Sequence, residues 1–155
     1  MFGSVSPTTM HDSLSSSLGH YFHHMLSAQE PGSPSKHVAR GAECVSAGDL
    51  AELRRLLPEV MAKAALITTS KRLRQRVELL AAFLRESPAV TDSPAQREVA
   101  FVLYYFLMGQ DLIPDSLPDI GLLDDALLVD AVMQRNLMVL QSDWADRKQP
   151  WPENI

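Results

Sequence analysis

An uncharged run of ten residues, VAFVLYYFLM at residues 99–108, leaves few possible folds for this chain. As a helix, the run would span about 15 Å at 1.5 Å per residue. A membrane-spanning helix needs about 20 apolar residues, so this run is too short to cross a bilayer. A short helix that is apolar on every side is typical of the buried centre of a helical bundle. We therefore expect a central helix here, with the other helices of the chain around it.

The composition of the chain is that of a single helical domain. The sequence has 155 residues, of which 46% are hydrophobic and 6% aromatic, and a chain of this size and apolar content can bury one core. Abundant leucine and alanine favour helices over strands. The net charge of −5 provides no basic field that would attract nucleic acid, so nucleic acid is not an expected partner.

The cysteine content and the first residues suggest a compartment. The single cysteine, Cys44, excludes an internal disulfide and suits a reducing environment. The first residues, MFGSVSPTTMHDS, lack the basic start and the apolar stretch of a signal peptide. We expect a soluble cytoplasmic protein without a transmembrane segment.

Capping residues and apolar spacing predict where the helices begin. Ser46, with an aspartate three residues later, is typical of a helix start, and leucines at three- and four-residue spacing continue from it to Ile67. A second pattern of this kind covers about residues 71–86. Ser93 followed by Pro94 predicts the start of the central helix, because proline suits the first helical position. A last helix is predicted from about Leu122.

The expected architecture is an all-α domain at residues 39–155, a small bundle of four to five helices with a Pro/Asp-rich helical hairpin corner. Residues 1–38 are rich in Ser, Pro and Gly, which bury too little surface to offset the entropy lost on ordering. We expect them to form a flexible N-terminal segment. Within it, apolar residues at helical spacing predict a short amphipathic helix: Leu14, Leu18, Phe22 and Met25.

The last predicted helix has apolar residues on two faces. At 100° per residue, one stripe contains Leu122, Ala126, Val129, Met133, Leu137 and Leu140. The opposite side contains Leu127, Leu128, Ala131 and Met138. A chain with few helices has limited means of covering both faces. The pattern therefore indicates self-association or a protein partner, unless the N-terminal helix covers the second face.

A Pro/Asp-rich corner precedes this helix. In DLIPDSLPD, residues 111–119, each proline lacks an N–H donor and pushes the preceding residue out of helical geometry, so one continuous helix is excluded. Aspartate side chains bond nearby backbone groups in such turns. We interpret the segment as a compact corner between two helices, with Asp111 and Asp119 as caps and the other aspartates as local braces.

A metal site is the alternative interpretation of the same segment. Hard cations such as Mg²⁺ and Ca²⁺ require several converging oxygen ligands. The candidate ligands are Asp111, Asp115, Asp124 and Asp125. The spacing of an EF-hand is absent, and the sequence offers no candidate catalytic residue.

The charges of the chain are unevenly distributed. Residues 54–85 carry eight of the fourteen basic side chains, whereas residues 111–130 carry six aspartates and no lysine or arginine. One interpretation is that Arg72, Arg74 or Arg76 reaches across to the acidic corner. The other is that these three arginines contact an anionic membrane surface.

The corner also resembles a known family. The residues that carry the resemblance are Asp111, Leu112, Ile113, Pro114, Asp115, Pro118, Gly121, Asp124 and Asp125. In this order they are similar to the signature of the YkvA-like bacterial domain of unknown function, and the similar region covers roughly residues 95–135. The resemblance implies a small helical domain, attached to membranes in some relatives, without a settled activity.

These observations lead to one expected function and two alternatives. We expect a non-enzymatic helical interaction or scaffold module that binds a protein partner or forms a homo-oligomer, with no cofactor. The first alternative is a divalent-cation-binding domain whose acidic corner holds Mg²⁺ or Ca²⁺ for a structural or hydrolytic role. The second is a protein attached peripherally to a membrane surface.

Overall fold

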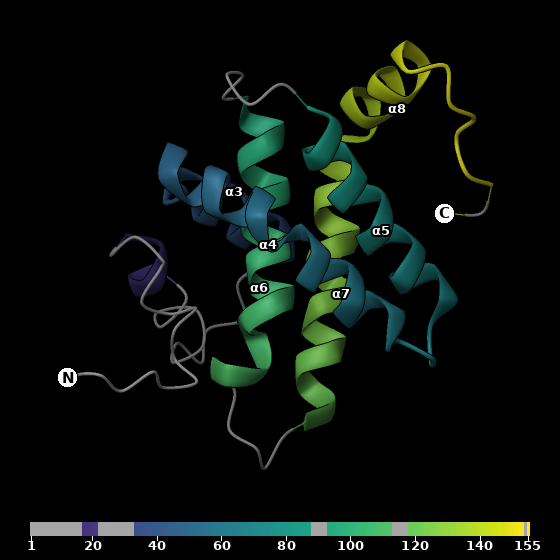
Figure 1. Ribbon diagram of the computed structural model, residues 1–155. Coiled ribbons are helices and arrows are strands. Elements are labelled where there is room, and N and C mark those ends of the chain that lie inside the picture. The colour runs from purple at the N-terminus through teal and green to yellow at the C-terminus, as the bar shows by residue number, and fades with distance from the viewer. Residues whose placement is uncertain (1–16, 22–32, 88–92, 113–117, 154) are drawn as a thin grey trace.

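The computed structural model describes residues 17–21, 33–87, 93–112, 118–153 and 155, and the side chains of residues 109–124 lie outside this description. Every regular element in the described residues is a helix (Figure 1), which confirms the predicted all-α class. The helices are α3 (Pro34–Glu43), α4 (Ala47–Ala65), α5 (Lys71–Glu86), α6 (Pro94–Leu112), α7 (Pro118–Arg135) and α8 (Leu137–Asp146). Residues 17–21 form a further short helical segment. The bundle therefore contains more helices than the four to five predicted.

Helix α6 lies at the centre of the bundle. It packs against α3, α4, α5 and α7, and Figure 1 shows α6 and α7 side by side through the middle of the molecule. All side chains of residues 99–108 are buried, which confirms the prediction of a central helix. The buried hydroxyl of Tyr104 donates a hydrogen bond to the backbone oxygen of Asp49 at 2.6 Å. Its polar atom is therefore satisfied inside the core.

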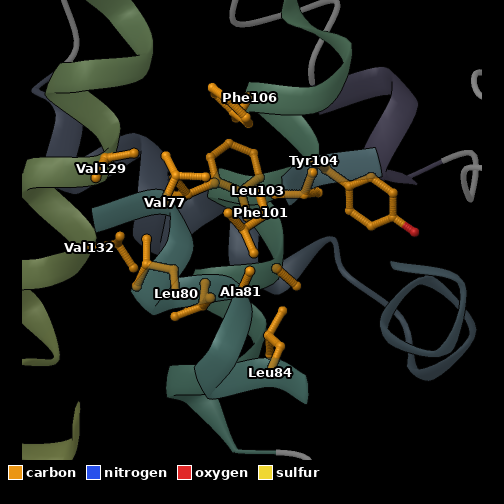
Figure 2. Packing of buried hydrophobic residues seen from close by; sticks show 14 of the residues in the cluster. Val77, Leu80, Ala81, Leu84, Phe101, Leu103, Tyr104, Phe106, Val129 and Val132 are labelled. Carbon is orange, nitrogen blue, oxygen red and sulfur yellow. The ribbon is translucent and has the colours of Figure 1, made fainter. Parts of the chain in front are cut away.

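The core is formed where α5, α6 and α7 meet. Figure 2 shows Val77 and Leu80 from α5 close to Leu103 from α6, with Val129 and Val132 of α7 on the other side. All five side chains are buried, and each such burial stabilises the fold by about 1.5–3 kcal/mol relative to an exposed side chain. The apolar stripe predicted for residues 71–86 is therefore the face of α5 that enters the core.

The helix starts use the capping residues that the sequence predicted. The Ser46 hydroxyl accepts from the Asp49 amide at 3.1 Å, and the Asp49 carboxylate accepts from the Ser46 amide at 2.9 Å. This reciprocal pair is a capping box at the start of α4. At α6, the Ser93 hydroxyl accepts from the Gln96 amide at 3.2 Å. Both caps satisfy amides that have no partner within their own helix.

Helix α3 was not predicted. The boundary expected at residue 38 falls within it, and its residues Val38, Gly41 and Ala42 are buried. Helix α3 packs on α6 and α7, so its first residues belong to the folded helical region. The local signal is the pair Ser33-Pro34, which caps α3 as Ser93-Pro94 caps α6. The Ser- and Pro-rich composition around it obscured this signal.

The Pro/Asp-rich segment separates two helices, as predicted, because α6 and α7 are distinct elements. Pro118 is the first residue of α7, a position where its missing N–H removes no helical hydrogen bond. Helix α7 therefore starts slightly earlier than the predicted Leu122. Residues 113–117, which include Pro114 and Asp115, lie outside the described residues. The bracing of the corner by its aspartates stays a prediction.

The single long helix predicted from Leu122 to Leu140 is wrong. It is divided at Asn136, whose φ of −120° and ψ of 19° are not helical, into α7 and α8. The Asn136 side-chain amide donates to the backbone oxygen of Val132 at 3.0 Å. Asparagine side chains compete with the helical backbone in this way, which explains the break.

Two tryptophans hold the C-terminal part of the chain. Trp144 is buried, and its ring meets that of Trp151 edge to face with 5.8 Å between centroids. The guanidinium of Arg147 lies over the Trp144 ring at 4.4 Å, a cation–π contact. Among the residues described here, no helix is both long enough and apolar enough to cross a membrane.

Candidate interaction surface and the polar network beside it

Three consecutive apolar side chains are exposed at the start of α8. Leu137 is 40% exposed, Met138 84% and Val139 49%, and we call these three residues the α8 apolar surface. The next residue, Leu140, is fully buried. Helix α8 therefore places one apolar side chain in the core and leaves three in solvent within a single turn. Clustered apolar side chains in solvent are a common mark of an interaction site.

The structure separates the residues that the sequence grouped on the second face of this region. Leu128 and Ala131 are buried within the chain, whereas Leu127 and Met138 are exposed. Helix α3 packs on α7, so part of the covering is supplied by a helix that the sequence did not predict. The apolar residues still in solvent are found mainly at the start of α8.

A polar network joins the start of α6 to the junction between α7 and α8. The Glu98 carboxylate is buried and accepts hydrogen bonds from the Arg135 guanidinium, through Nε and Nη2, both at 2.9 Å. The Asn136 amide donates to the same carboxylate at 3.0 Å. The third guanidinium nitrogen of Arg135, Nη1, donates to the Ser35 hydroxyl of α3 at 3.0 Å. We call Glu98, Arg135 and Asn136 the junction clamp.

The electrostatics of the junction clamp favour an ionised Glu98. Burial by itself raises the pKa of this carboxyl group, but the hydrogen bonds from Arg135 and Asn136 and the charge of Arg135 outweigh it. The pKa of Glu98 therefore lies below its ordinary value of 4.5. The same contacts raise the pKa of Arg135. A paired, bidentate carboxylate of this kind is among the stronger polar contacts in proteins.

Acidification is expected to remove part of the stability that Glu98 provides. Because its pKa is lower in the folded state, the stabilisation is present above the unfolded pKa and is lost as the pH falls through the folded pKa. The urea midpoint of the wild type, measured at a series of acidic pH values, should therefore fall more steeply than that of Glu98→Gln. Identical slopes for the two proteins would contradict the assignment.

The control for this titration is Glu43→Gln. Glu43 is exposed and lines the same groove as Glu98, together with Arg97 and Arg135. The urea midpoint of Glu43→Gln should change with pH as steeply as that of the wild type, because an exposed carboxylate contributes little to the stability of the fold. The groove has a volume of about 500 Å³ and is also lined by Ala39, Ala42 and Pro94. It gives solvent a route to the edge of the junction clamp.

Of the four predicted metal ligands, only Asp125 has a described side chain. Asp125 is buried at a described position. Asp115 and Pro114 lie outside the described residues, and so do the side chains of Asp111, Pro118, Asp119 and Asp124, whereas Gly121 is part of α7. Within the described part of the chain, no group of three or more His, Cys, Asp or Glu residues could hold a metal ion. Binding of Mg²⁺ or Ca²⁺ by the corner stays a prediction.

Of the three arginines considered for an anionic surface, Arg76 has an acidic partner among the described residues. The Arg76 guanidinium donates to the Asp130 carboxylate at 3.1 Å and links α5 to α7. Asp130 belongs to the acidic stretch of residues 111–130 but lies on α7 and not at the corner, so a contact between these arginines and the corner stays a prediction. Arg72 is exposed and Arg74 is partly exposed, so membrane contact by these two residues stays a prediction.

The residues of the junction clamp were not identified from the sequence. A glutamate directly before the apolar run of residues 99–108, and an Arg-Asn pair at the end of an apolar helix, were the available signals. A buried glutamate requires a partner, but the sequence separates Glu98 and Arg135 by a whole helical hairpin. Only the antiparallel packing of α6 and α7 brings them together.

Comparison with known proteins identifies a short segment. No curated protein and no solved structure matches the chain. Residues 98–129 match a family model described as "Protein of unknown function (DUF1232)". The matched segment begins at Glu98 and includes most of α6, the Pro/Asp-rich corner and the first part of α7.

Proposed function

We propose that this chain is a non-enzymatic helical interaction module that self-associates through the α8 apolar surface. The observation that carries the proposal is the exposure of Leu137, Met138 and Val139 in one turn. Burying an apolar side chain of this size is worth about 1.5–3 kcal/mol. A second copy that covered these three side chains would recover this free energy.

The local charge distribution allows a second copy as the occupant, although the net charges of two copies repel. Each chain carries a net charge of −5, so two copies repel one another where their carboxylates face. In a twofold dimer the same patch meets itself, and every charge near the axis meets its own copy. Residues 137–142, LMVLQS, contain no ionisable side chain. This turn of α8 can therefore approach its own copy without an unpaired charge.

The polar groups beside this surface support a structural role. Both carboxylate oxygens of Glu98 accept hydrogen bonds, and all three guanidinium nitrogens of Arg135 donate. A general base or acid must have a lone pair or proton directed at a substrate, whereas these groups are directed at one another. This engagement fits a scaffold better than a catalytic centre.

Met138→Asp is expected to convert a wild-type dimer into a monomer. The substitution places a charge opposite its own copy and removes the most exposed apolar side chain, so we expect a loss of about 2 kcal/mol or more, or at least roughly thirtyfold in Kd. Sedimentation velocity over a concentration series measures the change. Circular dichroism should show an unchanged helix content, because the side chain is 84% exposed.

The matched control is Leu66→Asp. Leu66 is 78% exposed at the end of α4, so the same change of chemistry is made on another helix end. This variant should dimerise like the wild type. A wild type that stays monomeric at the highest concentration overturns the proposal. If the wild type is a monomer that binds a different protein, and Met138→Asp abolishes this binding, the α8 apolar surface is the site for that protein. This result also overturns self-association.

A further inference from the structure

Helix α8 is attached to the bundle by few buried side chains. Along its length only Leu140 and Trp144 are buried, and they are one helical turn apart. Figure 1 shows α8 at the end of the bundle, beyond the end of α7. A helix with so few buried contacts depends on its junction for its direction, because local stability follows the number of buried contacts.

The junction is fixed by one carboxylate from another helix. Glu98 of α6 accepts from Arg135, the last residue of α7, and from Asn136, the residue between α7 and α8. The Asn136 amide also donates to the backbone oxygen of Val132 at 3.0 Å. Two consecutive residues are therefore held by the same acceptor at the point where the chain changes direction.

The chemistry of this contact requires a carboxylate. An ionised carboxylate is an acceptor on both oxygens, and a guanidinium has donors only. A glutamine at position 98 has nearly the same shape but offers one acceptor and one donor group. The donor group would face Arg135 or Asn136, so the three-way contact is lost without creating a cavity.

We propose that Glu98 is a positioning residue that sets the direction of α8 and so holds the α8 apolar surface in place for self-association. The effect of Glu98 on self-association rests on the proposed function, because a dimer requires Leu137, Met138 and Val139 in one fixed arrangement. Its primary effect, the docking of α8, does not depend on whether a dimer forms. The position of α8 is therefore set by a residue of α6, the helix that packs beside α7.

The two tryptophans provide a direct readout. The sequence contains only two, Trp144 and Trp151; Trp144 lies on α8, and Trp151 follows α8 and packs against Trp144. Intrinsic fluorescence and its quenching by acrylamide therefore report on the docking of this part of the chain. Hydrogen exchange of the amides of residues 137–146, followed by mass spectrometry, gives a second measurement.

In Glu98→Gln, the amides of α8 are expected to exchange about tenfold faster or more than in the wild type. Hydrogen bonds to a charged group are stronger than those between neutral groups, and a tenfold change in exchange corresponds to about 1.4 kcal/mol. The acrylamide quenching constant should rise in parallel. Amides of α5 and of the buried part of α6 should change much less, because their core contacts are untouched.

The matched control is Asp130→Asn. It breaks an ion pair of similar length between α5 and α7, Arg76 to Asp130 at 3.1 Å, which does not touch the junction. This variant should leave α8 exchange and tryptophan quenching at wild-type values even if it lowers the melting temperature. If the exchange rate of the α8 amides rises equally in both variants, the cause is general destabilisation and the inference is overturned. An unchanged exchange rate in a folded Glu98→Gln would also overturn it.

A second variant keeps the inference testable if Glu98→Gln does not fold. Asn136→Ala removes one donor to Glu98 while the Arg135 contact remains, so α8 exchange should increase in the same direction by a smaller factor. No increase in this variant would overturn the inference. These measurements are made on the monomer at low concentration. A monomeric wild type would therefore refute self-association while α8 exchange still decides the role of Glu98.

Discussion

Phe101→Ala is expected to lower the free energy of unfolding by about 3–5 kcal/mol, the usual cost of removing a buried aromatic ring. Phe101 is fully buried on the central helix α6. Its ring meets that of Tyr21 edge to face with 5.7 Å between centroids. A typical domain has a free energy of unfolding of about 5–15 kcal/mol, so this single truncation removes a large part of the total. The cavity would lie between α6, α3 and residues 17–21, because Gly41 and Tyr21 both lie against the Phe101 ring. We expect the surrounding residues to fill it only in part.

Urea unfolding followed by circular dichroism measures this loss. The control is Leu66→Ala, a truncation at a residue that is 78% exposed, which should change the free energy of unfolding by less than about 0.5 kcal/mol. The m-value should be the same in both variants if each unfolds from the same folded state. A loss below 1 kcal/mol for Phe101→Ala would show that the ring does not occupy the centre of the packing.

The central part of this fold could be predicted from short-range signals in the sequence. The apolar run of residues 99–108, the stripe of residues 71–86 and the caps at Ser46 and Ser93 are all present in the structure. Each of these features depends on neighbours within one or two helical turns. Periodicity and capping depend only on residues that are close in the sequence, so both can be predicted from a single sequence.

The errors have a different physical origin. Helix α3 lies in a stretch with the composition of a linker, and it is stabilised by contacts with α6 and α7 that no local pattern contains. The break at Asn136 depends on an asparagine side chain that bonds both its own helix and Glu98. Helix propensities differ by less than 1 kcal/mol for such residues, so tertiary contacts decide between one helix and two.

The candidate site was predicted in part. Of the second apolar face predicted for the last helix, Leu127 and Met138 are exposed but Leu128 and Ala131 are buried, so the pattern could not separate covered from uncovered residues. A helical wheel gives the direction of a side chain and not the element that lies opposite. The junction clamp was missed for the same reason, since Glu98 and Arg135 are adjacent only after α6 and α7 pack.

The close approach of α3 to α6 depends on Gly41. A Cβ atom placed on Gly41 would lie 2.2 Å from the nearest atom of the Phe101 ring, well inside the van der Waals distance. The ring cannot move aside freely, because Phe101 is fully buried and is packed against Tyr21. The absence of a side chain at Gly41 is therefore what lets α3 lie against the central helix.

Gly41→Val is expected to lower the free energy of unfolding by about 3 kcal/mol, at the upper end of the usual cost of overpacking. The clash exceeds the gain from replacing a helical glycine, which is at most about 1 kcal/mol. The control is Gly48→Val in the exposed first turn of α4, where a Cβ meets nothing closer than the Ser46 hydroxyl at 3.7 Å. That change should stay within about 0.5 kcal/mol of the wild type.

A double-mutant cycle identifies the clash as the cause. Phe101→Val removes the ring atoms that a side chain at Gly41 would meet, so Gly41→Val should cost at least about 1 kcal/mol less in that background than in the wild type. Urea unfolding of the four proteins gives the coupling free energy directly. Additive losses would mean that Gly41 and Phe101 do not share this contact. In that case residues other than Gly41 would decide how closely α3 packs against α6.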